Sequence, residues 1–203
     1  MKVDRPVALA ELPLPLQLGL QFNAATSHAD RYRIIRELLD HSFLHLTDSR
    51  KEFAASSEDA LTCTVILGLT SVGVSAIHDK QIGGHADLVV EGRDNFRWIG
   101  EAKLYSGPSQ VHGGYLQLTT RYGVSQPGRD SGDLIIYCKR DNATTKLEGW
   151  KGYLFKKTTG VTLVEPLDPE RPFEFKTVAT CEATGLPFNT RHVIVPMYHN
   201  PKK

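Results

Sequence analysis

The first part of the chain contains one stretch with a clear helical period and one that prolines interrupt. Between residues 27 and 46, apolar side chains recur at intervals of three and four, which predicts an amphipathic helix. Ser27 and Asp30 have the spacing of a capping box at its start. Residues 11–22 contain the run Leu-Pro-Leu-Pro-Leu, and proline removes an amide donor and restricts the residue before it. We therefore expect residues 1–25 to form an extended N-terminal arm.

Helical and strand patterns alternate through the rest of the chain. The expected elements are a helix over 56–69, strands over 71–77, 86–91 and 96–105, a helix over 107–123, a strand over 133–139, a helix over 144–155, and two or three strands up to residue 198. This order indicates an α/β fold in which helices pack on a sheet. No repeat, low-complexity tract or linker interrupts residues 26–203, so we expect them to form one domain.

Composition and charge narrow the class of protein only slightly. The chain has 203 residues, of which 40% are hydrophobic and 23% charged, as in many soluble globular proteins. No apolar run approaches the roughly 20 residues of a membrane helix, and the N-terminus lacks the apolar segment of a signal peptide. We therefore expect a cytoplasmic protein that does not contact membranes. The formal net charge of +1 does not by itself indicate a nucleic-acid partner.

Several signatures of other protein classes are missing from the sequence. Cys63, Cys138 and Cys181 are odd in number and far apart, so they predict neither a disulfide framework nor a zinc site. We expect them to be buried thiols, because free cysteine is among the most buried residue types. The phosphate-binding loop of ATPases, the dinucleotide-binding glycine motif and the nucleophile elbow of α/β-hydrolases are also absent.

The strongest chemical pattern is an acid in one expected strand followed by an acid and a lysine in the next. Asp87 lies in Gly-His-Ala-Asp-Leu-Val-Val, and Glu101 and Lys103 lie in Gly-Glu-Ala-Lys. Because side chains alternate along a strand, Glu101 and Lys103 point to the same face. Two carboxylates beside an amine can hold a hard divalent cation and position a water near it. A structural interpretation stays open, in which Asp87 bonds turn amides and Glu101 pairs with Lys103.

This ordered set resembles the PD-(D/E)xK nuclease superfamily. Its members combine a first Asp with a Glu-x-Lys strand, which here are Asp87, Glu101 and Lys103. Many members also carry a glutamine in the following helix, where this chain has Gln117. The proline that often precedes the first Asp is replaced by Ala86. The resemblance covers about residues 58–140. It implies a restriction-endonuclease-like fold, with a mixed central sheet flanked by helices and a core over about 55–140.

The resemblance also implies a role for individual residues. The catalytic set would be Asp87, Glu101, Lys103 and Gln117. The ligands of Mg²⁺, for which Mn²⁺ can substitute, would be Glu58, Asp87, Glu101 and the backbone carbonyl of Ala102. Asp59 and Glu52 are alternatives to Glu58, and an acid in a first helical turn can also simply favour the helix dipole. His85 and Arg121 would contact the substrate, although His85 could instead cap a turn.

The function that follows from the resemblance is metal-dependent hydrolysis of phosphodiester bonds in DNA, by an endonuclease rather than an exonuclease. Lys103 would orient the attacking water, stabilise charge at the phosphate or accept a proton, and the sequence leaves these roles open. The absence of a sequence-reading module suggests an effector with a partner protein, for example in bacterial defence against phage. The alternatives are a non-catalytic nucleic-acid-binding or scaffolding subunit and a small repair nuclease.

Overall fold

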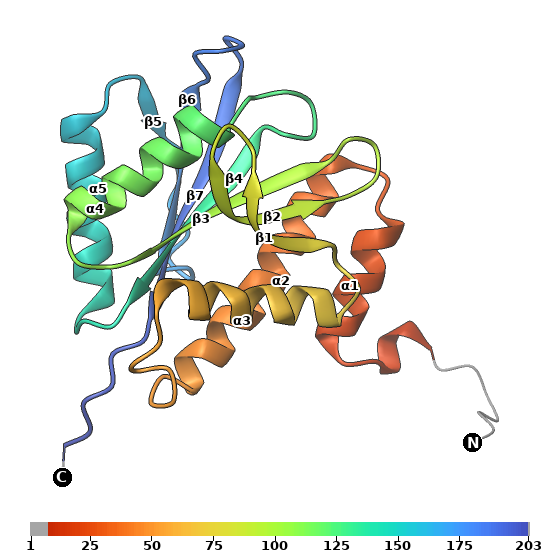
Figure 1. The fold of residues 1–203 in the computed structure, drawn as a ribbon, viewed down its shortest axis with the longest axis horizontal. Coiled ribbons are helices and arrows are strands. Elements are labelled where there is room, and N and C mark those ends of the chain that lie inside the picture. The colour runs from red at the N-terminus through yellow and green to blue at the C-terminus, as the bar shows by residue number, and fades with distance from the viewer. Residues whose placement is uncertain (1–7, 203) are drawn as a thin grey trace.

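A seven-stranded mixed sheet forms the centre of the protein in the computed structural model, which describes residues 8–202 (Figure 1). Its strands are β1 (Ala76–Gln81), β2 (His85–Glu91), β3 (Arg97–Leu104), β4 (Ser131–Cys138), β5 (Val161–Leu163), β6 (Glu174–Thr180) and β7 (Pro187–Pro196). They lie in the order β1-β2-β3-β4-β7-β6-β5. The central strands β3, β4 and β7 run parallel, and the outer pairs are antiparallel. The protein is therefore a mixed α/β protein.

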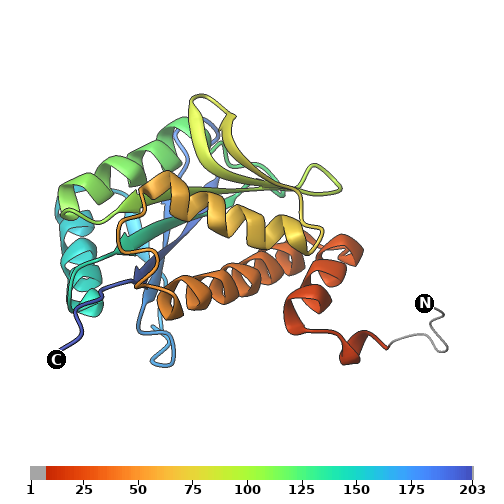
Figure 2. The same ribbon diagram turned by 60° about the horizontal axis from the view of Figure 1, so that its bottom comes forward.

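Helices cover both faces of this sheet. In the described residues they are α1 (Leu14–Ala24), α2 (His28–Asp48), α3 (Glu58–Ser71), α4 (Pro108–Leu116) and α5 (Ala143–Lys157), with a short 3₁₀ turn (Leu9–Glu11) and a π-helical turn, η2 (Gln117–Tyr122). The first three α-helices pack on one face, and α4, η2 and α5 pack on the other (Figures 1 and 2). No helix in residues 8–202 is long and apolar enough to cross a membrane.

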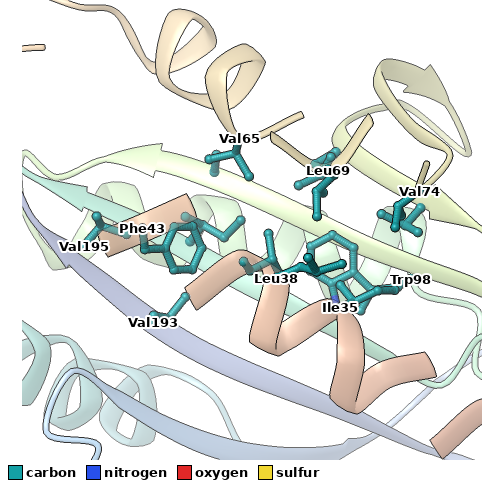
Figure 3. Packing of buried hydrophobic residues seen from close by; sticks show 14 of the residues in the cluster. Ile35, Leu38, Phe43, Val65, Leu69, Val74, Trp98, Val193 and Val195 are labelled. Atoms are coloured by element: carbon teal, nitrogen blue, oxygen red, sulfur yellow. The ribbon is translucent and has the colours of Figure 1, made fainter. Parts of the chain in front are cut away.

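The larger core lies between the sheet and the first three helices. Figure 3 shows side chains of α2 and α3 meeting those of the strands. The residues labelled there are Ile35, Leu38, Phe43, Val65, Leu69, Val74, Trp98, Val193 and Val195. All of them are buried, and removing this much apolar surface from water drives the helices onto the sheet.

The second core lies under α4 and α5, and alternation along β3 decides which residues face it. Trp98 and Ala102 belong to the core on the α3 side, whereas Ile99 belongs to the core on the α4 side. Glu101 and Lys103 follow Ile99 with a period of two. The acidic and basic side chains of β3 therefore lie on the face that α4 covers.

The N-terminal segment differs from the sequence-based expectation. Residues Leu14–Ala24 form the helix α1, so the prediction of an extended arm is wrong there. Pro13 is the N-cap and Pro15 lies in the first turn, where a missing amide hydrogen breaks no helical hydrogen bond. Leu18 and Phe22 are buried, and their packing holds the helix on the domain. Residues 1–7 of the expected arm lie outside the described residues.

The other expected elements are present, and two of them differ clearly from their expected boundaries. The strand expected over 71–77 is Ala76–Gln81, because α3 continues to Ser71 and a turn at Gly73 (φ 82°) follows. The helix expected over 107–123 changes to a π-helical turn at residue 117. The predicted capping by Ser27 is confirmed, since its side chain accepts a hydrogen bond from the Asp30 amide. Ser57 caps α3 in the same way.

The cysteines are free, as the sequence predicts, but not all are buried. Cys138 and Cys181 are buried, and Cys63 is exposed on α3. The expectation of three buried thiols is therefore wrong for Cys63, which lies on the outward face of its helix.

Candidate active site

Four of the sequence-predicted residues meet in one cluster. Asp87 comes from β2, Glu101 and Lys103 from β3, and Glu58 is the first residue of α3. The ammonium nitrogen of Lys103 lies 2.6 Å from Glu101 Oε1, 3.5 Å from Glu58 Oε1 and 3.7 Å from Asp87 Oδ2. We call these four side chains the acid–lysine cluster. The lysine lies among all three carboxylates.

Strand pairing positions Asp87. The antiparallel register pairs Leu88 with Gly100, so Asp87 lies beside Glu101. Asp87 Oδ2 accepts a hydrogen bond of 2.8 Å from the backbone N–H of Ala102. The carboxylate is thus fixed to the neighbouring strand rather than left to solvent.

A helix start positions Glu58 in a similar way. Ser57 caps α3 by accepting a hydrogen bond from the Ala60 amide, which places Glu58 in the first turn. The Glu58 carboxylate accepts a hydrogen bond from the backbone N–H of Leu104 at the end of β3. Asp59 is exposed next to it, and Glu52 is exposed in the turn before the helix. Of the three acids considered from the sequence, Glu58 is the one that the structure brings to the cluster.

Glu101 is a buried and under-bonded carboxylate. Its exposure is 1%, its Oε1 lies 2.6 Å from the Lys103 ammonium, and its Oε2 has no hydrogen-bond partner in the described chain. Among residues 8–202, Lys103 is the one cationic side chain that pairs with it. Burial raises the pKa of Glu101 to about 7; the negative charge of Asp87 adds to this rise, and Lys103 opposes it. A buried acid with so few hydrogen-bond donors is costly unless a cation offsets the cost, and in the described chain Lys103 supplies part of that offset.

Lys103 stays charged in this environment. Burial acts to lower its pKa, but the carboxylates of Glu101, Asp87 and Glu58 outweigh burial, and the net pKa is raised. The ammonium group also donates a 2.8 Å hydrogen bond to the carbonyl of Ala102. The arrangement favours a fixed positive charge over a proton acceptor.

The donor set suits a hard divalent cation. Carboxylate and carbonyl oxygens are the ligands that Mg²⁺ prefers, and the under-bonded Glu101 has free acceptor sites. Within residues 8–202, no group of three or more His, Cys, Asp and Glu side chains has the geometry to hold a metal ion as it stands. The cluster carboxylates instead share the Lys103 ammonium, so metal binding requires that this ammonium moves aside.

Three further predicted residues form no bond with the cluster. Gln117 is half-buried and Arg121 exposed in η2. The ring of His85 pairs with Asp79 at 2.9 Å, and the His85 carbonyl accepts a 2.7 Å hydrogen bond from Tyr122. In the described chain, no hydrogen bond or ion pair joins Gln117, Arg121 or His85 to the cluster. Burial, together with the carboxylates nearby, raises the pKa of Tyr122.

A cleft beside Glu58 is a feature that sequence reasoning missed. Its volume is about 690 Å³. It is lined by Ser57, Glu58, Asp59, Leu104, Tyr105, Ser106, Gln110, Lys139 and Arg140. These residues come from α3, α4 and the ends of β3 and β4. The only signal in the sequence is that Lys139 and Arg140 directly follow an apolar strand, whose end neighbours that of β3 in a parallel sheet. We call this hollow the Glu58 cleft.

Comparison with known proteins identifies no protein similar to this chain. No protein-family model matches the chain, and no curated protein or solved structure matches it significantly. The fold and the site therefore define the class of protein only as mixed α/β with an acid–lysine cluster at the sheet.

Proposed function

We propose that this protein is a Mg²⁺-dependent nuclease that hydrolyses phosphodiester bonds in DNA and has the restriction-endonuclease-like fold of the PD-(D/E)xK superfamily. The observation that carries the proposal is Glu101, a buried carboxylate that lies beside Asp87, Glu58 and Lys103 and whose Oε2 has no hydrogen-bond partner in the described chain. The Lys103 ammonium offsets part of the cost of burying this acid, and a divalent cation would use the acceptor sites that the lysine leaves free.

Each residue of the cluster has a defined task in this function. Glu58, Asp87, Glu101 and the carbonyl of Ala102 would hold Mg²⁺, or Mn²⁺ in its place. A bound divalent cation lowers the pKa of a water and neutralises charge at the phosphate. Lys103, whose pKa is raised, would stabilise negative charge that develops on the attacked phosphate.

The remaining predicted residues would act on the substrate. Gln117 and Arg121 share η2, at the side of the sheet that the cluster faces, and Arg121 is exposed. We propose that Gln117 contacts the scissile phosphate and that Arg121 and His85 bind the flanking strand. DNA, endonuclease action, a cytoplasmic location and a partner protein in an anti-phage system belong to the same proposal and rest on the resemblance in sequence.

One observation favours a second candidate, a non-catalytic nucleic-acid-binding or scaffolding subunit. The Lys103 ammonium already lies among three carboxylates, which is also the arrangement of a structural ion-pair cluster. A structural ion-pair cluster does not need to bind divalent cations, whereas a nuclease site must bind them. The two candidates therefore differ in their response to Mg²⁺.

A cleavage assay with matched variants tests the proposal. The full chain is incubated with plasmid and single-stranded DNA in Mg²⁺, Mn²⁺ or EDTA, beside Glu101→Gln and Lys103→Ala. Glu148→Gln and Lys151→Ala remove an acid and a lysine of an ion pair on α5 and serve as controls. We expect metal-dependent cutting that the two cluster variants lose and the two controls keep. Cutting that persists in both cluster variants would refute the site, and a wild type that neither cuts nor binds Mg²⁺ would favour the subunit.

A further inference from the structure

The Glu58 cleft adjoins the acid–lysine cluster, and two cations line it together with Asp59. Glu58 belongs to the cluster and also lines the cleft, so the two meet at this residue. Lys139 and Arg140 line the cleft from the end of β4. A group bound at the cluster therefore has a neighbouring hollow into which a longer ligand can extend.

Lys139 is a cation that pairs with no carboxylate of the described residues. Its ammonium donates hydrogen bonds to the carbonyls of Ala54 at 2.9 Å and Ser56 at 2.6 Å. Burial lowers its pKa, and no ion pair of Lys139 occurs within residues 8–202. An ammonium group has three donors, so one remains for a ligand. Lys139 also fixes the loop that leads into Glu58.

Arg140 and Tyr105 complete the chemistry of the cleft. Arg140 is exposed, and its guanidinium forms no ion pair or side-chain hydrogen bond with a described residue. Tyr105 is half-buried, and its hydroxyl likewise has no hydrogen-bond partner in the described chain. Cations that track a phosphate backbone, interleaved with an aromatic ring on which bases stack, are the usual elements of a surface that binds single strands.

We infer that the Glu58 cleft binds a single-stranded stretch of polynucleotide next to the bond that is cut. Arg140 and the free donor of Lys139 bind phosphates, and Tyr105 stacks on an unpaired base. A paired base in a duplex has both faces covered by its neighbours, so the aromatic contribution requires an unpaired strand. This inference rests on the proposed nuclease function and adds the form of the substrate to it.

Binding measured over a range of salt concentrations tests the inference. The full chain in EDTA is titrated against a fluorescent single-stranded DNA oligonucleotide and against the same sequence as a blunt duplex. Arg140→Ala and Tyr105→Leu are compared with Arg93→Ala, an exposed arginine without a described partner in the β2–β3 turn, and with Phe155→Leu on α5. Thermal unfolding of each variant shows whether it is folded.

Each variant has a distinct expected result. Arg140→Ala should weaken single-strand binding and reduce the slope of log K against log salt by about 0.7, the value for one phosphate contact. Tyr105→Leu should weaken single-strand binding about 5- to 150-fold, which corresponds to one stacked base, and leave the slope and duplex binding unchanged. The two control variants should match the wild type.

Other results would overturn the inference without deciding the nuclease function. Three results would refute it. The salt slope of Arg140→Ala could equal that of Arg93→Ala, or Tyr105→Leu could weaken duplex binding as much as single-strand binding. The third is a wild type that does not bind the single strand. A wild type that still cuts plasmid in Mg²⁺ would then keep the nuclease proposal. Conversely, binding that depends on Arg140 and Tyr105 without any cutting would support the cleft and contradict the nuclease.

Discussion

The burial of Glu101 makes the stability of the protein depend on pH in an unusual direction. Its pKa is about 7 in the folded chain, compared with an ordinary value of 4.5. Between these two pH values the folded chain keeps a proton that the unfolded chain releases. The free energy of unfolding therefore falls as the pH rises from 4.5 to about 7, and the Glu101 contribution is constant outside this window.

The size of this effect follows from the two pKa values. One pKa unit corresponds to about 1.4 kcal/mol, so ionisation of Glu101 should cost about 3 kcal/mol of stability. Glu101→Gln keeps the shape of the side chain and cannot ionise. The wild type should therefore lose about 3 kcal/mol relative to Glu101→Gln between pH 4.5 and 8.

Urea unfolding in EDTA measures this difference. Both proteins are unfolded at several pH values, and the effects of groups that titrate in both cancel in the comparison. Glu148→Gln, at an exposed position on α5, controls for the loss of a carboxylate. A difference between wild type and Glu101→Gln that stays constant from pH 4.5 to 8 would refute the reasoning, because it would mean that Glu101 ionises equally easily in the folded and unfolded chains.

Three further predictions concern the same site and its support. Mg²⁺ affinity measured by calorimetry should increase with pH up to about 7 and then level off, because binding must displace the Glu101 proton. Gly114→Ala should lower cleavage, since a Cβ there would lie 2.8 Å from Cγ of Lys103, whereas Gly113→Ala meets nothing within 4 Å and should retain activity. Leu69→Ala, in a fully buried position, should cost about 2–5 kcal/mol in urea unfolding, and a cost below 1 kcal/mol would contradict the packing described here.

The sequence predicts those elements whose apolar pattern is set by local burial. The periodic residues of α2 and the apolar run of β4 predict these two elements correctly because each packs against a core. The boundaries of strand β1 differ from the prediction because it is an edge strand whose residues, such as His78 and Asp79, are mostly exposed and show no apolar alternation. The helix α1 was missed because its prolines lie at the start, where proline is tolerated.

The same distinction between local pattern and tertiary packing applies to the candidate site. Asp87, Glu101 and Lys103 lie on adjacent strands, so local alternation and a short turn are enough to predict that they meet. The Glu58 cleft joins the ends of strands and helices that are far apart in the sequence. Tertiary packing brings its cations, Lys139 among them, to the cleft, and the periodic pattern of the sequence does not predict this packing.

The hydrogen bonds that hold Asp87 and Glu58 also give the site a built-in spectroscopic reporter. Each carboxylate accepts from a different amide of the same strand, Asp87 from Ala102 and Glu58 from Leu104. The proton chemical shifts of these two amides depend on the charge and position of their acceptors. The amide resonances of Ala102 and Leu104 in one NMR spectrum would therefore report separately on Asp87 and Glu58 when protons, cations or substrate bind at the cluster.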